Sequence, residues 1–248
     1  MHNPADSFVS TLLARLKSPG FAFVEGASMR PLLTALGEMT DWADFVESWN
    51  QLEPDPYLAT KGRFRRRRHA TFSAAADGPV VPEAHQAHFQ SLQYNPLQGD
   101  LQRWFEPVAA SVANGATMGT ILRFCHRFFG TLAPKALRWH IEVHQFRIEA
   151  TAETAGEPTP EGSHRDGVDY VLVLLVNRQN IASGTTTIHA PDGRPLGDFT
   201  LTHALDAALI DDHSVYHGVT PVRPLDADAP ACRDVLVVTF KASASAPE

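Results

Sequence analysis

Hydrophobic residues along the first half of the chain recur mostly at the three- and four-residue spacing of amphipathic helices. Between residues 7 and 16, for example, Phe8, Leu12 and Leu16 form one apolar stripe. Further helices are predicted over residues 31–36, 41–50, 101–113 and 117–129, and a short strand over residues 20–24. This half of the chain is therefore expected to be mainly helical.

After Pro134 the pattern changes to short apolar runs separated by clusters of Gly, Pro and Asp. Strands are predicted over residues 139–148, 168–176, 185–189, 207–210 and 235–240. Many short strands with turn signals between them are typical of an antiparallel barrel or jelly roll. We expect an α+β protein with one domain over residues 1–248, in which residues 1–135 are a mainly helical support region and residues 136–248 form most of the jelly-roll core.

The composition restricts the classes of function. A net charge of −7 argues against a nucleic-acid partner. Cys125 and Cys232 are too few for a disulfide framework, so buried reduced thiols are expected. The N-terminus lacks the pattern of a secretory signal, and no apolar run reaches the length of a membrane span. These features predict a soluble cytoplasmic protein without a membrane partner.

Three side chains with metal-binding chemistry stand in two short motifs. His164 and Asp166 lie two residues apart, on one face of an extended segment, and His217 lies far downstream. Two imidazoles and one carboxylate are the ligand set of non-heme Fe(II) oxygenases, which leaves the opposite side of the metal open. His213 is the rival of His217, and a surface His-x-Asp pair without a metal is the alternative. The ligand types alone also permit zinc.

The surroundings of the His-x-Asp pair favour a site. Glycines flank the pair, so the backbone there can bend sharply, and an apolar run over residues 168–176 predicts a buried strand that leads away from it. If Asp166 points inward in a regular strand, Tyr170 shares its side. Tyr170 then either lines the cavity as a cofactor contact or is a core tyrosine. Five other histidines are expected on the surface or satisfied in the core: His126, His140, His144, His189 and His203.

A basic run over residues 63–69 offers candidates for substrate binding. Read as a strand, it places Arg66 and Arg68 on a partly apolar side, where a guanidinium needs a carboxylate. We therefore predict that Arg66 or Arg68 binds a substrate carboxylate, with internal ion pairing as the alternative. Gln145 and Arg147 alternate with apolar residues on one strand face, so they are predicted to line the cavity as cosubstrate and substrate contacts, with structural hydrogen bonding as the alternative.

Several stretches in a fixed order resemble one family, the bacterial 2-oxoglutarate/Fe(II) dioxygenases that include L-isoleucine hydroxylase and the BsmA-type biofilm and stress proteins. The similarity extends from about residue 20 to residue 240. The stretches that carry it are FRRRRH from residue 64, FQSLQYNPL from 89, RWFEP from 103, VHQFRI from 143, PEGSHRDG from 160, SGTTT from 183, HGVTP from 217 and RDVLVVTF from 233.

The resemblance implies a double-stranded β-helix and Fe(II) held by His164, Asp166 and His217. It also implies that 2-oxoglutarate chelates the metal, that O2 is the oxidant, and that a basic residue on the last core strand binds the far carboxylate of 2-oxoglutarate. We assign Arg233 to that carboxylate, because a guanidinium matches a carboxylate bidentately. Arg223 is the second candidate. The commoner dioxygenase pattern has Ser two residues after this Arg, where the chain has Val235.

The activity that the resemblance implies is hydroxylation of a small molecule, such as a free or modified aliphatic L-amino acid. Two other classes stay open from the sequence. One is a non-catalytic jelly-roll protein that binds a metal or small molecule in stress or biofilm regulation. The other is a cupin-like zinc hydrolase or isomerase, which has no need of an arginine for 2-oxoglutarate. A homodimer is an open alternative to a monomer.

Overall fold

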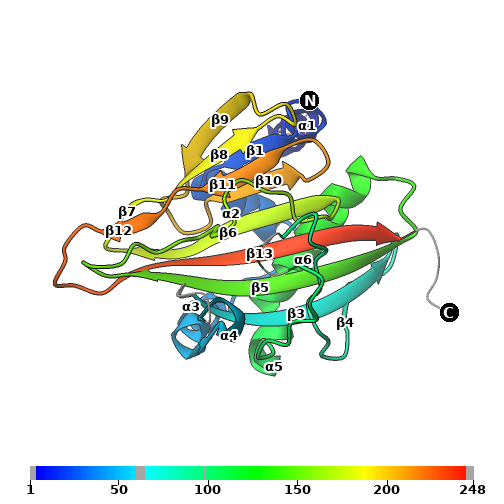
Figure 1. Ribbon diagram of the computed structural model, residues 1–248. Helices are drawn as coiled ribbons and strands as arrows, with labels where there is room; N and C mark the ends of the chain where they lie inside the picture. Colours follow the sequence, from blue (N-terminus) through cyan, green and yellow to red (C-terminus); the bar gives the residue numbers. More distant parts are fainter. Residues whose placement is uncertain (1–3, 60–64, 96, 98, 244–248) are drawn as a thin grey trace.

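A computed structural model describes residues 4–59, 65–95, 97 and 99–243 of the chain, so two of the motif residues quoted above, Phe64 and Pro96, lie outside the described residues. The largest element is an eight-stranded antiparallel sheet (Figure 1), and β4 pairs with β3 beside the main strand path. In spatial order the path is β1 (Phe21–Val24), β10 (Ala207–Asp211), β6 (Tyr170–Gln179), β13 (Ala231–Ser243), β5 (Arg138–Ala150), β3 (Arg66–Ala75) and β2 (Glu53–Pro54), with β4 at Val81–Pro82.

Two smaller sheets complete the β-structure. One contains β11 (Tyr216–Val219), β8 (Thr185–His189) and β9 (Pro195–Thr200), and the other pairs β12 (Val222–Pro224) with β7 (Ile181–Ser183). In Figure 1, β8, β9 and β11 appear above β6, β13 and β5, and β7 and β12 appear at the left. A main antiparallel sheet faced by smaller antiparallel sheets is the arrangement of a jelly roll, so the predicted double-stranded β-helix is confirmed.

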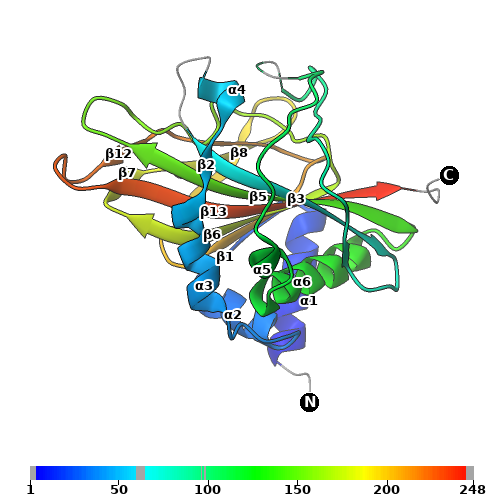
Figure 2. The ribbon, with the colours of Figure 1, turned by 90° about the horizontal axis from the view of Figure 1, so that it is seen from below.

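Most helices gather on one side of the main sheet, and the short helix α4 lies on the other side (Figure 2). Figure 2 shows α1, α2, α3, α5 and α6 together below the strands, while β8 lies on the opposite side. The helical segments are α1 (Pro4–Lys17), α2 (Gly26–Thr34), α3 (Trp42–Glu47), the 3-10 helix η1 (Ser48–Gln51), α4 (Pro56–Ala59), α5 (Ala110–Ala113) and α6 (Ala116–Leu132). None of these helices in the described chain is long and apolar enough to cross a membrane.

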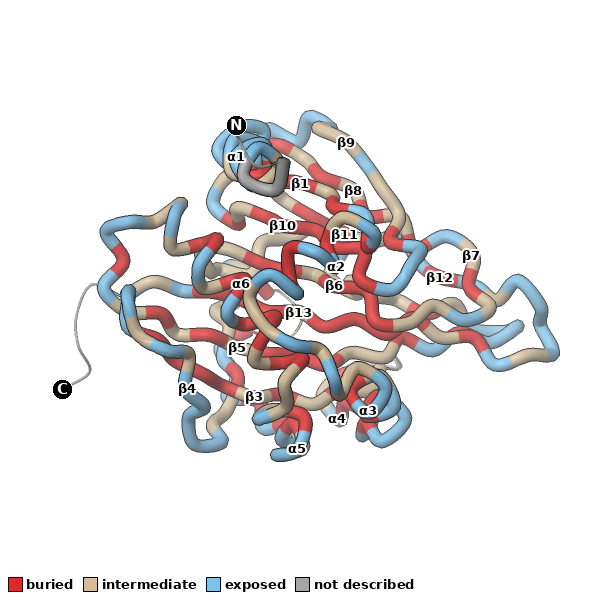
Figure 3. Tube along the Cα trace, turned by 180° about the vertical axis from the view of Figure 1, so that it is seen from behind, coloured by how far each residue is buried: buried red, intermediate tan, exposed pale blue. Residues whose placement is uncertain are grey.

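Alternation along the central strands separates a packed face from a cavity face. On β5, Ile141 and Val143 are fully buried in the core that the helices cover, whereas Glu142 and His144 line a cavity on the other face. The strands β6, β13 and β3 follow the same rule, because successive side chains of a strand point to opposite faces. Figure 3 shows the long buried stretches of these strands and the exposed outer surface of α1.

The aromatic ring of Phe129 on α6 fixes the helical layer to the sheet. The ring lies 5.3 Å from the ring of Phe240 on β13 and 5.0 Å from that of Tyr170 on β6, measured between centroids. Phe129 is fully buried. Aromatic pairs at these separations stabilise a core beyond the area that they bury.

Most elements agree with the sequence pattern. The helices expected at 7–16 and 117–129 are confirmed, as are all five strands expected after Pro134. The two cysteines are free thiols, also as expected. The first 135 residues supply β2, β3 and β4 to the main sheet in addition to the predicted helices and β1.

The helix predicted over residues 101–113 is wrong, because only residues 110–113 are helical, as α5. The segment before α5 is extended instead. Arg103 forms a bridge with His88, and Pro107 forms one with His69 on β3. Pairing with these neighbours satisfies backbone groups that a helix would have satisfied internally, so tertiary structure overrides the local pattern here.

Candidate metal centre and its cavity

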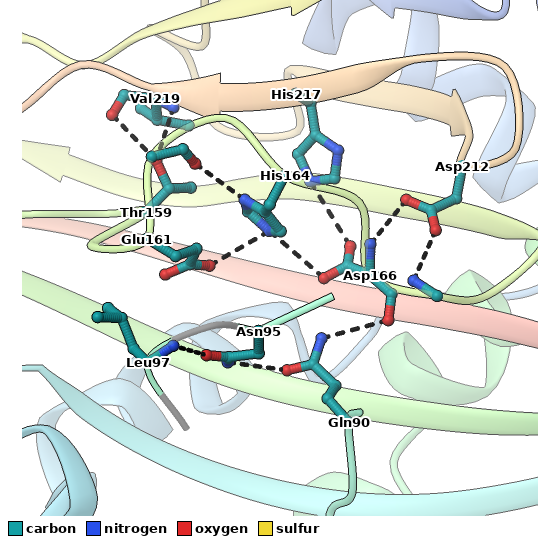
Figure 4. Close-up of polar contacts among 12 residues, drawn as sticks. Gln90, Asn95, Leu97, Thr159, Glu161, His164, Asp166, Asp212, His217 and Val219 are labelled. Carbon is teal, nitrogen blue, oxygen red and sulfur yellow. Dashed lines mark hydrogen bonds and ion pairs between the residues drawn. The ribbon is translucent and has the colours of Figure 1, made fainter. Parts of the chain in front are cut away.

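His164, Asp166 and His217 come together between the loop before β6 and strand β11 (Figure 4). Their candidate ligand atoms all lie within 4.8 Å of one another. His164 Nε2 is 3.5 Å from Asp166 Oδ1, and His217 Nε2 is 3.5 Å from Asp166 Oδ2. The carboxylate therefore faces both imidazoles, and one ion between the three side chains could contact all of them.

Backbone pairing brings the two histidines side by side. The N–H of His164 donates to the carbonyl of His217 at 2.9 Å, and the N–H of His217 donates to the carbonyl of His164 at 2.9 Å. This single antiparallel bridge joins the loop to β11. The ring centroids are consequently 4.6 Å apart. The carboxylate of Glu161 lies 3.3 Å from His164 Nε2.

A second carboxylate, that of Asp212, holds the turn that carries Asp166. It accepts hydrogen bonds from the backbone N–H groups of Asp166 at 2.9 Å, Gly167 at 2.7 Å and Val168 at 3.1 Å. Gly167 has a φ of 82°, and a Cβ there would lie 2.5 Å from the ring of Tyr94. The turn therefore needs glycine at this position, both for its backbone and for its close contact. The sequence analysis did not identify Asp212, although an Asp-Asp pair at the end of a strand was a visible signal.

The three clustered side chains have different protonation tendencies. Burial opposes protonation of His164, but its contacts with Asp166 and Glu161 raise its pKa to about 9. Burial lowers the pKa of His217 to about 4, with His164 adding to the effect. Against burial, the two histidines hold the pKa of Asp166 well below its usual range. The site thus combines an ionised carboxylate with a neutral imidazole, and a bound cation would displace the proton from the other imidazole.

Asp212 stays a hydrogen-bond acceptor in a less favourable environment. Burial and the charge of Asp166 raise the pKa of Asp212 to about 6, although its three backbone hydrogen bonds act in the opposite direction. Two carboxyl groups close together disfavour each other's ionisation, which explains the sign of the shift.

The cluster opens into a cavity of about 420 Å³ between the main sheet and the smaller sheet that contains β11. A volume of this size suits a small molecule. Its walls combine apolar side chains from β6 and β13 with charged side chains from β3 and β5. Lining residues include Arg65, Arg67, Arg103, Glu142, His144, Phe146, Val173, Arg233, Val235 and Val237.

Arg233 lines the cavity with 2% of its surface exposed. Its Nε and Nη2 atoms are buried and have no hydrogen-bond partner among the described residues. Burial, together with the nearby charge of Arg178, lowers the pKa of Arg233 to about 10, so the guanidinium is charged at neutral pH. A buried cation with unused donors is costly unless an anion completes it. Arg223, the second candidate, is exposed on β12 and does not line the cavity.

His213, the rival of His217, lies outside the cluster. Its Nε2 is 2.8 Å from Asp169 Oδ1, and its side chain is 70% exposed. Of the two histidines, the structure therefore brings only His217 to His164 and Asp166.

The assignment of Tyr170 to the cavity is wrong. Its ring stacks on Phe129 on the helical face of the sheet, and Tyr170 is not among the cavity-lining residues. A cavity position for Tyr170 requires a regular strand from Asp166 onward. The turn at Gly167 interrupts that strand, and β6 begins only at Tyr170, so the alternation of sides does not carry across the turn.

The predicted cavity roles of Gln145 and Arg147 are also wrong. Gln145 Nε2 donates to Ser48 Oγ at 2.8 Å on the helical face. Arg147 forms two hydrogen bonds with the carboxylate of Asp234, at 2.7 and 2.8 Å. The strand β5 does alternate as expected, but the face that contains both residues is the one away from the cavity. Each has the structural role that was the stated alternative.

Arg66 and Arg68 likewise point away from the cavity. Arg66 Nε is 3.1 Å from a carboxylate oxygen of Glu149 at the surface, and Arg68 Nη2 donates to the carbonyl of Gln51 at 3.0 Å. The structure therefore places neither guanidinium in the cavity where the predicted substrate role requires it. Arg67, on the other side of β3, lies in the cavity wall, and so does Arg65, the residue before the strand.

A jelly roll that presents two imidazoles and one carboxylate to a cavity is typical of mononuclear metal oxygenases. Comparison with known proteins specifies the family. A family model described as 2OG-Fe dioxygenase matches residues 46–239. The chain therefore belongs to the 2OG-Fe dioxygenase family, whose members use Fe(II), 2-oxoglutarate and O2. The expected family and cofactors are confirmed.

Three relatives show the extent of the similarity. L-isoleucine-4-hydroxylase of Bacillus thuringiensis is 30% identical over 192 residues, which cover 76% of this chain and 78% of the relative. 3(1)-hydroxy-L-isoleucine 4-dioxygenase of Pantoea ananatis is 24% identical over 239 residues, with 91% and 93% covered. The crystal structure of a bsmA homolog from Methylobium petroleophilum PM1 superposes with a TM-score of 0.83 at 36% identity, with 97% and 96% covered.

The hydrogen bonds of Asp212 lead to a prediction about the turn. Replacing Asp212 with Ala leaves three partly buried N–H groups without their acceptor, and the amides of residues 166–168 should exchange with solvent roughly 10-fold faster or more. Native-state hydrogen exchange measures the change. Asp192→Ala, in an exposed loop, is the control and should leave these amides unchanged. Equal exchange rates in Asp212→Ala and the parent protein would contradict this account of the turn.

Proposed function

We propose that this dioxygenase hydroxylates a free aliphatic L-amino acid, with iron bound by His164, Asp166 and His217 and with 2-oxoglutarate bound by Arg233. The observation that carries the proposal is that one cavity contains both the three clustered side chains and the buried guanidinium of Arg233, which has unused donors. The two curated relatives, an L-isoleucine hydroxylase and a hydroxyisoleucine dioxygenase, support an amino acid as the substrate class. The cytoplasmic location and the homodimer stay predictions.

The residues present fit the metal and the cosubstrate. Imidazole and carboxylate are ligands that Fe(II) accepts, and three of them on one side leave positions for other ligands. Asp166 neutralises part of the metal charge. The guanidinium of Arg233 compensates a carboxylate of 2-oxoglutarate, and its planar donors suit that group. Fe(II) with 2-oxoglutarate and O2 supplies the oxidising chemistry for insertion of oxygen into a C–H bond.

The chain contributes binding, orientation and exclusion of water. An apolar strip of the cavity wall consists of Val173, Val235 and Val237. Arg233 precedes Val235 on the same face of β13. An aliphatic substrate carbon held over this strip is shielded from bulk solvent. Such shielding favours oxidation of the substrate over side reactions with water.

The metal ligands are tested by removing one histidine of the second motif at a time. His217→Ala should reduce bound iron from about one equivalent to a small fraction, because only two of the three protein ligands remain. His213→Ala is the matched control and should bind iron normally. Iron content, together with the weak visible charge-transfer band that Fe(II) and 2-oxoglutarate give without oxygen, provides the measurement. A band that persists in His217→Ala and vanishes in His213→Ala would reverse the assignment.

The two candidate arginines make opposite predictions for 2-oxoglutarate. Arg233→Met should raise the Kd of 2-oxoglutarate about 30-fold or more, because a buried charge pair loses one partner. Arg223→Met alters an exposed side chain and should leave this Kd unchanged. Anaerobic titration of the Fe(II)-loaded protein, followed through the charge-transfer band, gives both constants. An unchanged Kd in Arg233→Met would exclude this anchor.

The reaction itself is tested with a panel of free L-amino acids that includes isoleucine, leucine and valine. Succinate should form in proportion to a product that is 16 mass units heavier, since one oxygen atom is inserted. Mass spectrometry of the amino acid and an assay of succinate measure the two products. Iron and 2-oxoglutarate binding without coupled turnover of any amino acid would exclude this substrate class.

A further inference from the structure

A second cluster of titratable side chains occupies the cavity wall over β5 and β3, apart from the metal centre. The carboxylate of Glu142 lies among four imidazoles. His88 Nδ1 is 2.8 Å from Glu142 Oε2, and the Nε2 atoms of His69, His140 and His144 lie 3.6 to 3.7 Å from its two oxygens. The sequence analysis assigned no function to these residues.

Among the described residues, only histidines lie within ion-pairing distance of the Glu142 carboxylate. Burial opposes its ionisation, but the four histidine contacts hold the pKa of Glu142 well below its usual range. Burial also lowers the pKa values of His69, His88 and His144. These three imidazoles are therefore neutral at neutral pH, while the carboxylate beside them is ionised.

Neighbouring strands provide an excess of positive charge. Arg67 lies 3.7 Å from Asp55, and Arg65 pairs with the same carboxylate at 3.1 Å. Two guanidiniums thus share one carboxylate. Arg67 is 3% exposed, and its Nε has no hydrogen-bond partner among the described residues. Its guanidinium lies 3.5 Å from the centre of the Phe105 ring, which fixes the plane of the group.

His144 occupies the gap between the two charged ends. Its Nδ1 accepts a hydrogen bond from Arg67 Nη2 at 2.7 Å, so its proton is on Nε2, the atom that faces Glu142. One imidazole ring therefore separates the guanidinium from the carboxylate. An α-amino acid lying against this ring from the cavity side would have one of its charged groups at each end of the ring.

We propose that Glu142 binds the α-ammonium group of the substrate and that Arg67 binds its α-carboxylate. This inference rests on the proposed function and identifies how the enzyme recognises a zwitterion. Cross-strand register places His144 beside Val237 on β13, which in turn lies beside Val173 on β6. The side chain of an amino acid held at its charged head would thus lie against the apolar strip of Val173 and Val237, in the cavity that also contains the metal centre.

A second metal ion is the rival occupant, because His69, His88, Glu142 and His144 also have the composition of a metal site. The hydrogen bond from Arg67 argues against it. An imidazole that binds a metal through Nε2 carries its proton on Nδ1, and at His144 that proton would face the donor of Arg67. Arg67 and Arg103 add positive charge near the same wall, which repels a dication. A zwitterion satisfies both charges.

The test compares substrate analogues with side-chain variants under conditions that prevent turnover. Protein with Fe(II) and 2-oxoglutarate, without oxygen, is titrated with L-isoleucine, with 3-methylpentanoate, which lacks the ammonium, and with L-isoleucinol, which lacks the carboxylate. Glu142→Gln should weaken L-isoleucine roughly 10- to 100-fold and leave 3-methylpentanoate unchanged. Arg67→Met should weaken L-isoleucine by a similar factor and leave L-isoleucinol unchanged.

The same two strands offer matched controls. Glu149 on β5 and Arg66 on β3 form an ion pair on the surface, outside the cavity. Glu149→Gln and Arg66→Met remove the same charges and should leave all three Kd values unchanged. The charge-transfer band of each variant reports whether the metal centre is intact. If a cavity variant does not fold, the parent protein still decides, because it must bind both analogues at least about 10-fold more weakly than L-isoleucine.

Several outcomes would overturn the inference. One is an equal loss of affinity for L-isoleucine and its analogues in either cavity variant. Another is that the parent protein binds none of L-isoleucine, L-leucine and L-valine. The third is a second equivalent of bound metal in the parent protein that is lost in Glu142→Gln. Selective losses in binding without any hydroxylated product would support the recognition of a zwitterion and contradict the proposed reaction. The two proposals therefore fail in distinguishable ways.

Discussion

The alternation of side chains along β5 determines which residues form the core under the helices and which form the cavity wall. This strand lies between β13 and β3, so both of its edges are hydrogen bonded and its register cannot slip without moving the whole sheet. Ile141 and Val143 on one face pack beneath the helices, and Glu142 and His144 on the other face the cavity. The apolar face therefore fixes the position of the polar face, and packing energy holds costly buried polar groups in place.

Charge in the cavity is organised around ions that come from outside the chain. The three clustered ligand residues suit a cation, Arg233 suits an anion, and the wall over β3 and β5 has one acidic and one basic end. Each group has incomplete partners in the protein alone. Binding of metal, cosubstrate and substrate together would neutralise these charges in pairs, and such complementarity favours specificity more than fold stability.

The sequence predicted the jelly roll and the convergence of His164, Asp166 and His217, because apolar runs and the family motifs are local signals. It did not predict which face of a strand meets the cavity. Alternation along the strand correctly placed Gln145 and Arg147 on the same face of β5. Packing against the helices decides which of the two faces lines the cavity. The alternating series His140, Glu142, His144 was a usable signal, since polar residues every second position mark one face of a strand whose other face is apolar.

The two halves of the cavity come from different parts of the fold. The motifs proposed to bind the metal belong to β11 and the loop before β6, whereas Arg67 lies on β3, which joins the sheet from the N-terminal region and pairs with β5. Substitutions on β3 can alter the part of the cavity wall that contains Arg67 without disturbing the backbone bridge between His164 and His217. A substitution on β3 would therefore change what this wall accepts and leave the three clustered side chains where they are.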